Sequence, residues 1–174
     1  MVRGGTLPAF SVPWHEPALL PHMLEQKGGE ATMSELELFA RLIQCEAGGE
    51  GDNGMRAVAS VVMNRVRIDY GEYGRYNTLR DVIFQAGQFN CARTELGGQV
   101  NLQNVYNMNP TQIHYDIANW AIAGNRLTNL SQALWFYNPY SVTCRNNFPS
   151  AVGYFVLRVG NHCFYNPAPS YADT

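Results

Sequence analysis

Charged side chains are scarce in this sequence of 174 residues. Asp, Glu, Lys and Arg together make up 15% of it, and the formal net charge is -2. The sequence has no cluster of lysines and arginines that would neutralise a run of phosphates, which argues against nucleic acid as a partner. The same scarcity argues against a basic helix that lies on a membrane surface.

Long apolar runs are lacking as well. No stretch approaches the roughly 20 residues that a helix needs to cross a bilayer, so we expect no membrane span. The first residues, MVRGGTLPAFSVPWHEP, contain neither the apolar segment nor the small-residue cleavage site of a secretory signal. The sequence therefore predicts a protein that is made and folded in a cytoplasm, or one whose signal has already been removed.

Spacings typical of metal ligands are also missing. The four cysteines contain no C-x-x-C pair and no two histidines lie three or four residues apart, so we expect no metal site. Two interpretations of the cysteines stay open. All four are buried free thiols, as is common for unpaired cysteine, or Cys144 and Cys163 form a disulfide, because both lie in a β-like C-terminal segment. The other two cysteines are Cys45 and Cys91.

The N-terminal part of the chain differs from the rest. Residues 1–33 contain four prolines and a Gly28-Gly29 pair and show no sustained periodicity, which predicts an arm or a linker. Residues 34–174 are predicted to form a single domain.

The domain is predicted to open with a helix between Ser34 and Gly48-Gly49. Ser34 and Glu37 form the S-x-x-E pattern of a capping box, and glycines commonly end a helix. Apolar residues recur at helical spacing and mark the buried side. They are Leu36, Phe39, Ala40, Ile43 and Ala47.

A second helix is predicted from about residue 55 to residue 66, with Asp52 or Asn53 as its N-cap. It is apolar nearly all round, so we expect it to be the central and most buried helix. A short helix, TLRDVIF, should follow, with Thr78 and Asp81 as a cap pair.

After this short helix, the residues as far as Asn109 predict a polar loop, and Pro110-Thr111 should start another long helix that Gly124 stops. One face of this helix is apolar. That face consists of Ile113, Ile117, Trp120 and Ala121.

From residue 133 onward the pattern becomes that of strands. ALWFYNP, YFVLRV and HCFY are short aromatic and β-branched runs, and Gly160-Asn161 between the last two is a hairpin signal, with a type II′ turn expected. Helices followed by a small antiparallel sheet predict an α+β fold.

Glu46 is unusual because it lies on the edge of the apolar stripe of the first predicted helix. It is about 20° from Phe39 around the helix axis, and it lies in the last turn, where the macrodipole disfavours a negative charge. Burial and the dipole both raise a carboxyl pKa, and a protonated acid is what a glycosidic oxygen needs as proton donor. The alternative is an ordinary solvated glutamate. Glu50 and Asp52 either supply a second carboxylate or only cap the next helix.

Several motifs resemble the spore cortex-lytic cell-wall hydrolases of the SleB/CwlJ type. They are ARLIQCEAGGEGDNGMRAVASVVMNRV (40–66), QAGQF (85–89), YNP (137–139) and GNHCFYNP (160–167). They occur in order over residues 34–167, and the HCFY ending is more similar to the CwlJ branch.

This resemblance implies a lysozyme-like, predominantly helical catalytic domain that cleaves the glycan strands of spore cortex peptidoglycan during germination. The essential glutamate of the family's E-A-x-G-E motif falls on Glu46, and the second glutamate falls on Glu50. The implied chemistry is that of a lytic transglycosylase, which cuts between N-acetylmuramic acid and N-acetylglucosamine with one acid/base group. Hydrolysis of the same strands, as by a muramidase or glucosaminidase, stays open.

The resemblance also implies partners and a location. Beyond the glycan strands, it implies a GerQ-like coat protein as anchor, a place at the boundary of spore coat and cortex, and synthesis without a signal peptide in the mother-cell cytoplasm. Calcium dipicolinate activates the CwlJ branch, but this sequence shows no Asp-rich calcium loop. No cofactor is expected.

Further residues are candidates for contact with a sugar. Amides and aromatic rings suit N-acetyl groups and sugar faces, although a plain turn, a core position or a structural histidine are the alternatives. The candidates are Gln85, Gln88, Phe89, Trp135, Tyr137, Asn138 and His162.

Two rival functions stay open. Cys91 and His162 occur in an order compatible with a cysteine amidase or endopeptidase that cleaves the stem peptide. The other rival is a coat or glycan-binding protein without catalysis that keeps a lysozyme-like shell.

Overall fold

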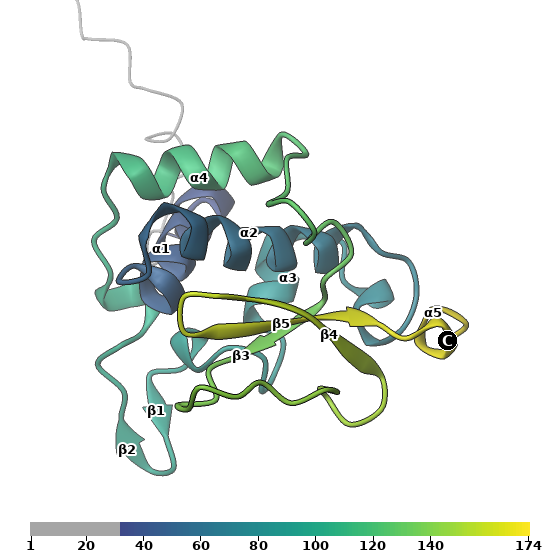
Figure 1. Ribbon diagram of the computed structural model, residues 1–174. Coiled ribbons are helices and arrows are strands. Elements are labelled where there is room, and N and C mark those ends of the chain that lie inside the picture. Colours follow the sequence, from purple (N-terminus) through teal and green to yellow (C-terminus); the bar gives the residue numbers. More distant parts are fainter. Residues whose placement is uncertain (1–31) are drawn as a thin grey trace, which may run out of the picture. The chain divides into compact units, whose positions relative to one another are not determined.

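The structure is a computed structural model that describes residues 32–174. The arm predicted for residues 1–33 therefore lies outside the described residues except for its last two. The four longest helices precede the three-stranded sheet in the chain and do not alternate with its strands (Figure 1), so the predicted α+β class is confirmed. The main helices are α1 (Glu35–Ala47), α2 (Gly51–Arg67), α3 (Leu79–Phe84), α4 (Gln112–Ile122) and α5 (Pro169–Ala172). Short 3₁₀ helices are η2 (Glu72–Arg75), η3 (Asn90–Ala92) and η4 (Val105–Asn107).

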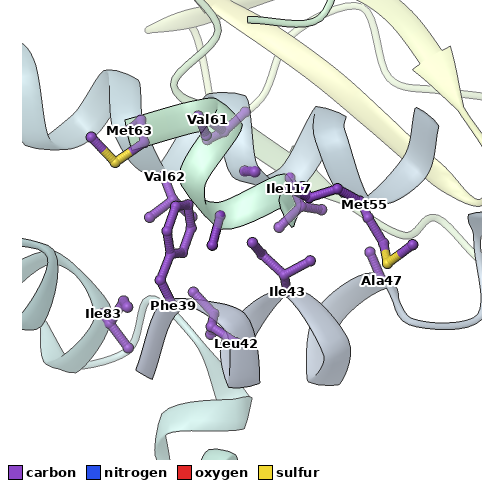
Figure 2. Packing of buried hydrophobic residues seen from close by; sticks show 14 of the residues in the cluster. Phe39, Leu42, Ile43, Ala47, Met55, Val61, Val62, Met63, Ile83 and Ile117 are labelled. Carbon is purple, nitrogen blue, oxygen red and sulfur yellow. The ribbon is translucent and has the colours of Figure 1, made fainter. Parts of the chain in front are cut away.

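Helix α1 begins and ends where the sequence predicts. The Ser34 hydroxyl accepts the Glu37 backbone N–H at 3.1 Å, and the Gly48 N–H donates to the Gln44 carbonyl beyond the last turn. Figure 2 shows Phe39 and Ile43 pointing from α1 into the core that α1 shares with α2 and α4.

Helix α2 begins at Gly51, about one turn earlier than predicted, and its N-cap is Glu50 in place of Asp52 or Asn53. Asp52 instead pairs with Arg56 in the first turn. The predicted central position is confirmed, because α2 contacts α1, α3, α4 and the strands β3 and β4.

Helices α3 and α4 lie where the sequence predicts them, but the residues that α4 buries differ in part from the predicted ones. Thr78 caps α3 by accepting the Asp81 backbone N–H at 3.1 Å, as expected. In α4 the predicted apolar face is partly wrong, since Ile113 is 40% exposed while His114 is buried. The His114 ring closes a capping box with Thr111. The buried face runs through His114, Ile117 and Ala121, and Ile113 lies outside it.

The C-terminal sheet has the strand order β3-β5-β4 and is antiparallel, as predicted. Its strands are β3 (Trp135–Tyr137), β4 (Gly153–Val159) and β5 (His162–Pro167). Gly160 has a φ of +56° in the β4–β5 turn, whereas Asn161 is not among the residues with positive φ, which agrees with a type II′ turn. The predicted polar loop contains an unforeseen hairpin of β1 (Glu95–Leu96) and β2 (Gln99–Val100).

All four cysteines are paired. Cys144 and Cys163 form the disulfide that one interpretation of the sequence allowed. Cys45 and Cys91 form a second one, so the interpretation of four free thiols is wrong. The sequence did not predict this second disulfide. Its cysteines lie at the end of α1 and in η3, and no pattern in the sequence indicated that these two segments are neighbours. Among the described residues, no helix is long and apolar enough to cross a membrane.

Candidate active site

Glu46 lies where two cavities of about 360 and 330 Å³ meet. The cavities have Glu46 and four other residues in common, and we call the two together the Glu46 cleft. The shared residues are Glu46, Asn90, Asn138, Tyr140 and His162. These shared lining residues therefore come from the end of α1, the loop around η3, and the end of the C-terminal sheet where β3 ends and β5 begins.

The carboxyl of Glu46 has an unusual proton affinity. Burial raises its pKa from 4.5 to about 7. The Arg65 guanidinium and the backbone N–H of Cys91 act in the opposite direction and lower this pKa. A carboxyl group with a pKa near neutrality is present in both the acid and the base form, which suits a group that must donate a proton and then accept one.

Arg65 projects from the buried face of α2 and is only 3% exposed. Its Nε donates to the Leu134 carbonyl at 2.7 Å, and its Nη1 donates to Gln88 Oε1 at 3.3 Å. Its guanidinium also lies over the rings of Tyr73 and Phe89, at 4.6 and 5.2 Å from their centroids. These contacts fix a positive charge beside Glu46.

Gln88 is held by two buried donors. Its Oε1 accepts from the Tyr73 hydroxyl at 2.9 Å as well as from Arg65. Both bonds engage the carbonyl end of the amide, and its NH₂ donates to no described residue. Gln88 lines the cleft, so this NH₂ group is available to a ligand there.

Glu50 and His162 form a closely packed pair in the same cleft. Glu50 Oε2 lies 2.7 Å from His162 Nδ1, and Glu50 Oε1 accepts the Asn161 backbone N–H at 3.1 Å. A Cβ on Gly54 would lie 2.5 Å from the Glu50 Cβ, and one on Gly160 would lie 3.2 Å from the Glu50 carboxyl. The two glycines thus make room for the Glu50 side chain.

The Cys45–Cys91 disulfide lines the cleft directly beside Glu46. It brings the backbone of Cys91 to the Glu46 carboxyl. It also means that Cys91 has no thiol to ionise, so the predicted role of Cys91 as the nucleophile of an amidase is wrong. His162, the proposed base, is instead paired with Glu50.

The structure brings most of the predicted site residues together and leaves two elsewhere. Gln85 lines neither cavity and donates from Nε2 to Glu72 Oε2 at 3.3 Å. Trp135 is 3% exposed and packs against Tyr73 and Tyr171, so its ring is part of the core. The predicted residues that do line the cleft are Glu46, Glu50, Gln88, Phe89, Tyr137, Asn138 and His162.

Several residues of the cleft were not predicted. Arg65 was detectable, because an arginine inside an otherwise apolar helix must be paired or functional. Phe136 lies between the candidates Trp135 and Tyr137 on β3. Its ring packs edge-on against His162, with 5.2 Å between the ring centroids. Loop residues gave no signal, since a polar residue in a loop is ordinary. The loop residues are Asn101, Gln103 and Tyr140, and Asn90 at the start of the short helix η3 gave no signal either.

Comparison with known proteins identifies the family. The profile of the Cell Wall Hydrolase family matches residues 49–165, about two thirds of the chain. The chain belongs to the Cell Wall Hydrolase family. It is therefore an enzyme that degrades the peptidoglycan of cell walls, and the family predicted from the sequence is confirmed. The match begins at residue 49, three residues after Glu46, and so does not include Glu46 itself.

Individual relatives agree with this assignment. The chain is 28% identical over 137 residues to the cell wall hydrolase CwlJ of Bacillus subtilis, which covers 79% of this chain and 88% of the relative. It is 29% identical over 140 residues to CwlJ of Oceanobacillus iheyensis, with 80% and 90% covered.

Two solved structures have a similar fold. The catalytic domain of the SleB protein of Bacillus cereus has a TM-score of 0.54 and 26% identity, with 76% of this chain and 89% of that chain covered. The catalytic domain of the germination-specific lytic transglycosylase SleB of Bacillus anthracis has a TM-score of 0.55 and 24% identity, with 80% and 100% covered. The predicted lysozyme-like catalytic domain with a small sheet is confirmed.

Proposed function

We propose that this cell wall hydrolase is a lytic transglycosylase that cuts the glycan strands of spore cortex peptidoglycan, with Glu46 as its acid and base. Glu46 supports this proposal because it is a cleft carboxyl with a pKa of about 7. Glu50, the other carboxyl of the cleft, has both oxygens engaged by His162 and Asn161. One titrating carboxyl is sufficient for a reaction in which the substrate supplies its own nucleophile.

In the proposed reaction, protonated Glu46 donates its proton to the oxygen between N-acetylmuramic acid and N-acetylglucosamine. The bond from this oxygen to the muramic C1 breaks, and the N-acetylglucosamine end leaves as an alcohol. Ionised Glu46 then takes the proton of the muramic 6-hydroxyl, whose oxygen closes a 1,6-anhydro ring on C1. The attack is intramolecular, which favours it over attack by water.

The polar groups around Glu46 suit a sugar chain with N-acetyl groups. The Gln88 NH₂ can donate to an acetamido carbonyl, and Asn90 and Asn138 add amides at the junction of the two cavities. Tyr137 and Tyr140 contribute aromatic rings to the same wall. Action on the spore cortex is supported by the CwlJ relatives. A place at the boundary with the spore coat and a coat protein as anchor are further parts of this proposal.

Digestion of purified cortex followed by mass spectrometry of the fragments tests the proposal. Anhydro-muramic ends are the expected products, and the Glu46→Gln variant should lose at least about 100-fold in rate, as is usual when a general acid is removed. Glu95→Gln is the matched control, because Glu95 is exposed on β1 and lies outside the cleft.

Other products would give other conclusions. Reducing ends on muramic acid or on glucosamine would replace the transglycosylase by a hydrolase, with water as the nucleophile. Intact glycan with cut stem peptides would overturn cleavage of the glycan altogether. If Glu46→Gln retained its activity, the assignment of the acid would be wrong.

A further inference from the structure

A cavity of about 830 Å³ lies apart from the Glu46 cleft and shares none of its lining residues. It is lined by the C-terminal end of α2, the segment after α4 and the chain around α5. Its volume lies within the range of about 300–1,000 Å³ that is typical of small-molecule sites. Nothing in the proposed cleavage reaction uses it.

Among residues 32–174, two arginines are the only charged residues that line it, Arg67 at the end of α2 and Arg126 after α4. Arg126 donates from Nε to Asn64 Oδ1 at 2.6 Å and from Nη1 to the Ala121 carbonyl at 2.9 Å. Arg67 donates from Nη2 to the Ile122 carbonyl at 3.0 Å. All these acceptors are uncharged oxygens, and neither arginine forms an ion pair within residues 32–174.

The positive charge of the two arginines exceeds the negative charge that the fold places beside them. Both arginines reach carbonyls in the last turn of α4, and Arg67 also lies in the last turn of α2. Each helix C-terminus offers roughly half of one negative charge, so the two dipoles together offset about one of the two positive charges. Burial and the neighbouring charge of Arg67 together lower the pKa of Arg126 to about 10, so the two groups repel each other.

Donors remain for a ligand. Each guanidinium has five N–H groups in a planar fork. Within the described residues, Arg67 donates hydrogen bonds from only one of its terminal nitrogens, and the Nη2 of Arg126 donates none. The rest of the wall combines apolar residues, with Ile68, Leu134 and Pro167 among them, and polar ones such as Ser131 and Gln132. A ligand that fits has an anionic group for the arginines and a short body that tolerates both kinds of neighbour.

We propose that this cavity is a carboxylate-binding site in which Arg67 and Arg126 hold the carboxylate of a small organic acid or of a peptide end. Arginine forks match the planar carboxylate in charge and in shape. The site is separate from the Glu46 cleft, so its occupancy and the cleavage reaction can be measured independently.

NMR titration of the ¹⁵N-labelled full chain tests this site with three probes. The first is glutarate, the second is an acetylated dipeptide that ends in D-alanine with a free carboxylate, and the third is the same dipeptide as its amide. We expect saturable shifts of the backbone amides of Ser131, Gln132 and Ala172, which line the cavity. The amide probe should cause none, because it has no charge for the arginines.

Arg67→Gln should weaken binding by about tenfold or more, since a hydrogen bond to a charged group is lost. Arg67 is exposed, so the variant should fold. Arg93→Gln removes the same charge at another exposed position and is the matched control. Binding of the dipeptide would indicate a peptide ligand, and binding of glutarate alone would indicate a free acid. No saturable shift with either carboxylate, or equal weakening by both substitutions, would overturn the site.

Discussion

Glu50 and His162 are 112 residues apart in the sequence, yet Glu50 Oε2 and His162 Nδ1 lie 2.7 Å apart in the cleft. The side chains are only 9% and 10% exposed. The pair joins the start of α2 to the start of β5, and so holds the helical part of the cleft against the sheet. In the proposed reaction, the pair beside Glu46 positions the site and Glu46 transfers the proton.

Glu50→Ala should therefore destabilise the domain by about 3 kcal/mol, because removal of one partner leaves a buried polar group without its bond. Chemical denaturation at pH 7 measures this free energy of unfolding. A double-mutant cycle with His162→Ala isolates the pair, since the second substitution should cost much less in the Glu50→Ala background. Additive costs would show that the two residues stabilise the domain independently.

Gly160→Ala is expected to disturb the same pair through the backbone. Gly160 has a φ of +56°, which alanine adopts only with strain, and an added Cβ would lie 3.2 Å from the Glu50 carboxyl. We expect a loss of stability of about 1–2 kcal/mol. Gly87→Ala is the control, because Gly87 has a similar φ of +78° but no atom within 4 Å of the added Cβ. Equal losses in both variants would assign the whole effect to backbone strain.

Glu46→Gln should become more stable than the wild type as the pH rises. The folded pKa of Glu46 is about 7 and the unfolded value is 4.5, so the folded state binds more protons between these values. The wild type therefore loses stability from about pH 4.5 to pH 7, by at most about 3 kcal/mol. Melting temperatures of both proteins between pH 4 and pH 8 should coincide at the acid end and diverge above it. Parallel curves would mean that the Glu46 pKa is unperturbed.

The pH profile of kcat/KM should fall on its basic side with a pKa of about 7, because the acid form of Glu46 starts the proposed reaction. The Arg65 charge lowers the pKa of Glu46, so Arg65→Gln should move this limb to higher pH. Arg65→Lys keeps the charge and should leave the limb near its wild-type position, with a reduced rate. Arg56→Gln removes a charge elsewhere on α2 and serves as control. An unmoved limb in Arg65→Gln would exclude this coupling.

The sequence predicted what depends on local pattern. The cap at Ser34, the turn at Gly160 and the position of Glu46 on the apolar stripe all follow from spacings within a few residues, and the structure has each of them. The start of α2 was predicted too late because Asp52 resembles an N-cap. Glu50 occupies that position without a side-chain cap bond, since its carboxyl is engaged by His162.

What the sequence did not predict depends on contacts between distant segments. Nothing near Cys45 indicates that Cys91 is its partner, and nothing near Gln88 indicates that Tyr73 and Arg65 hold its amide. Such contacts arise only when the helices and the sheet pack together. For this reason Glu46 was detectable from the sequence, and most of the residues around it were not.

The two disulfides should differ in what their loss does to activity. Chain entropy assigns about 4 kcal/mol to the Cys45–Cys91 bond and about 3 kcal/mol to the Cys144–Cys163 bond, from loops with sequence separations of 46 and 19. Both double serine variants should therefore unfold more easily. Only the first bond lies beside Glu46, where the Cys91 backbone N–H lowers the pKa of the carboxyl.

Cys45→Ser combined with Cys91→Ser should lose rate under conditions in which the protein is still folded, and the basic limb of its pH profile should move upward as the Cys91 N–H moves away from Glu46. Cys144→Ser combined with Cys163→Ser should keep both the rate and the position of the basic limb, because neither of these cysteines lines the cleft. Circular dichroism at the assay temperature identifies the folded samples. Equal rates in the two folded variants would mean that the first disulfide stabilises the domain without positioning the acid.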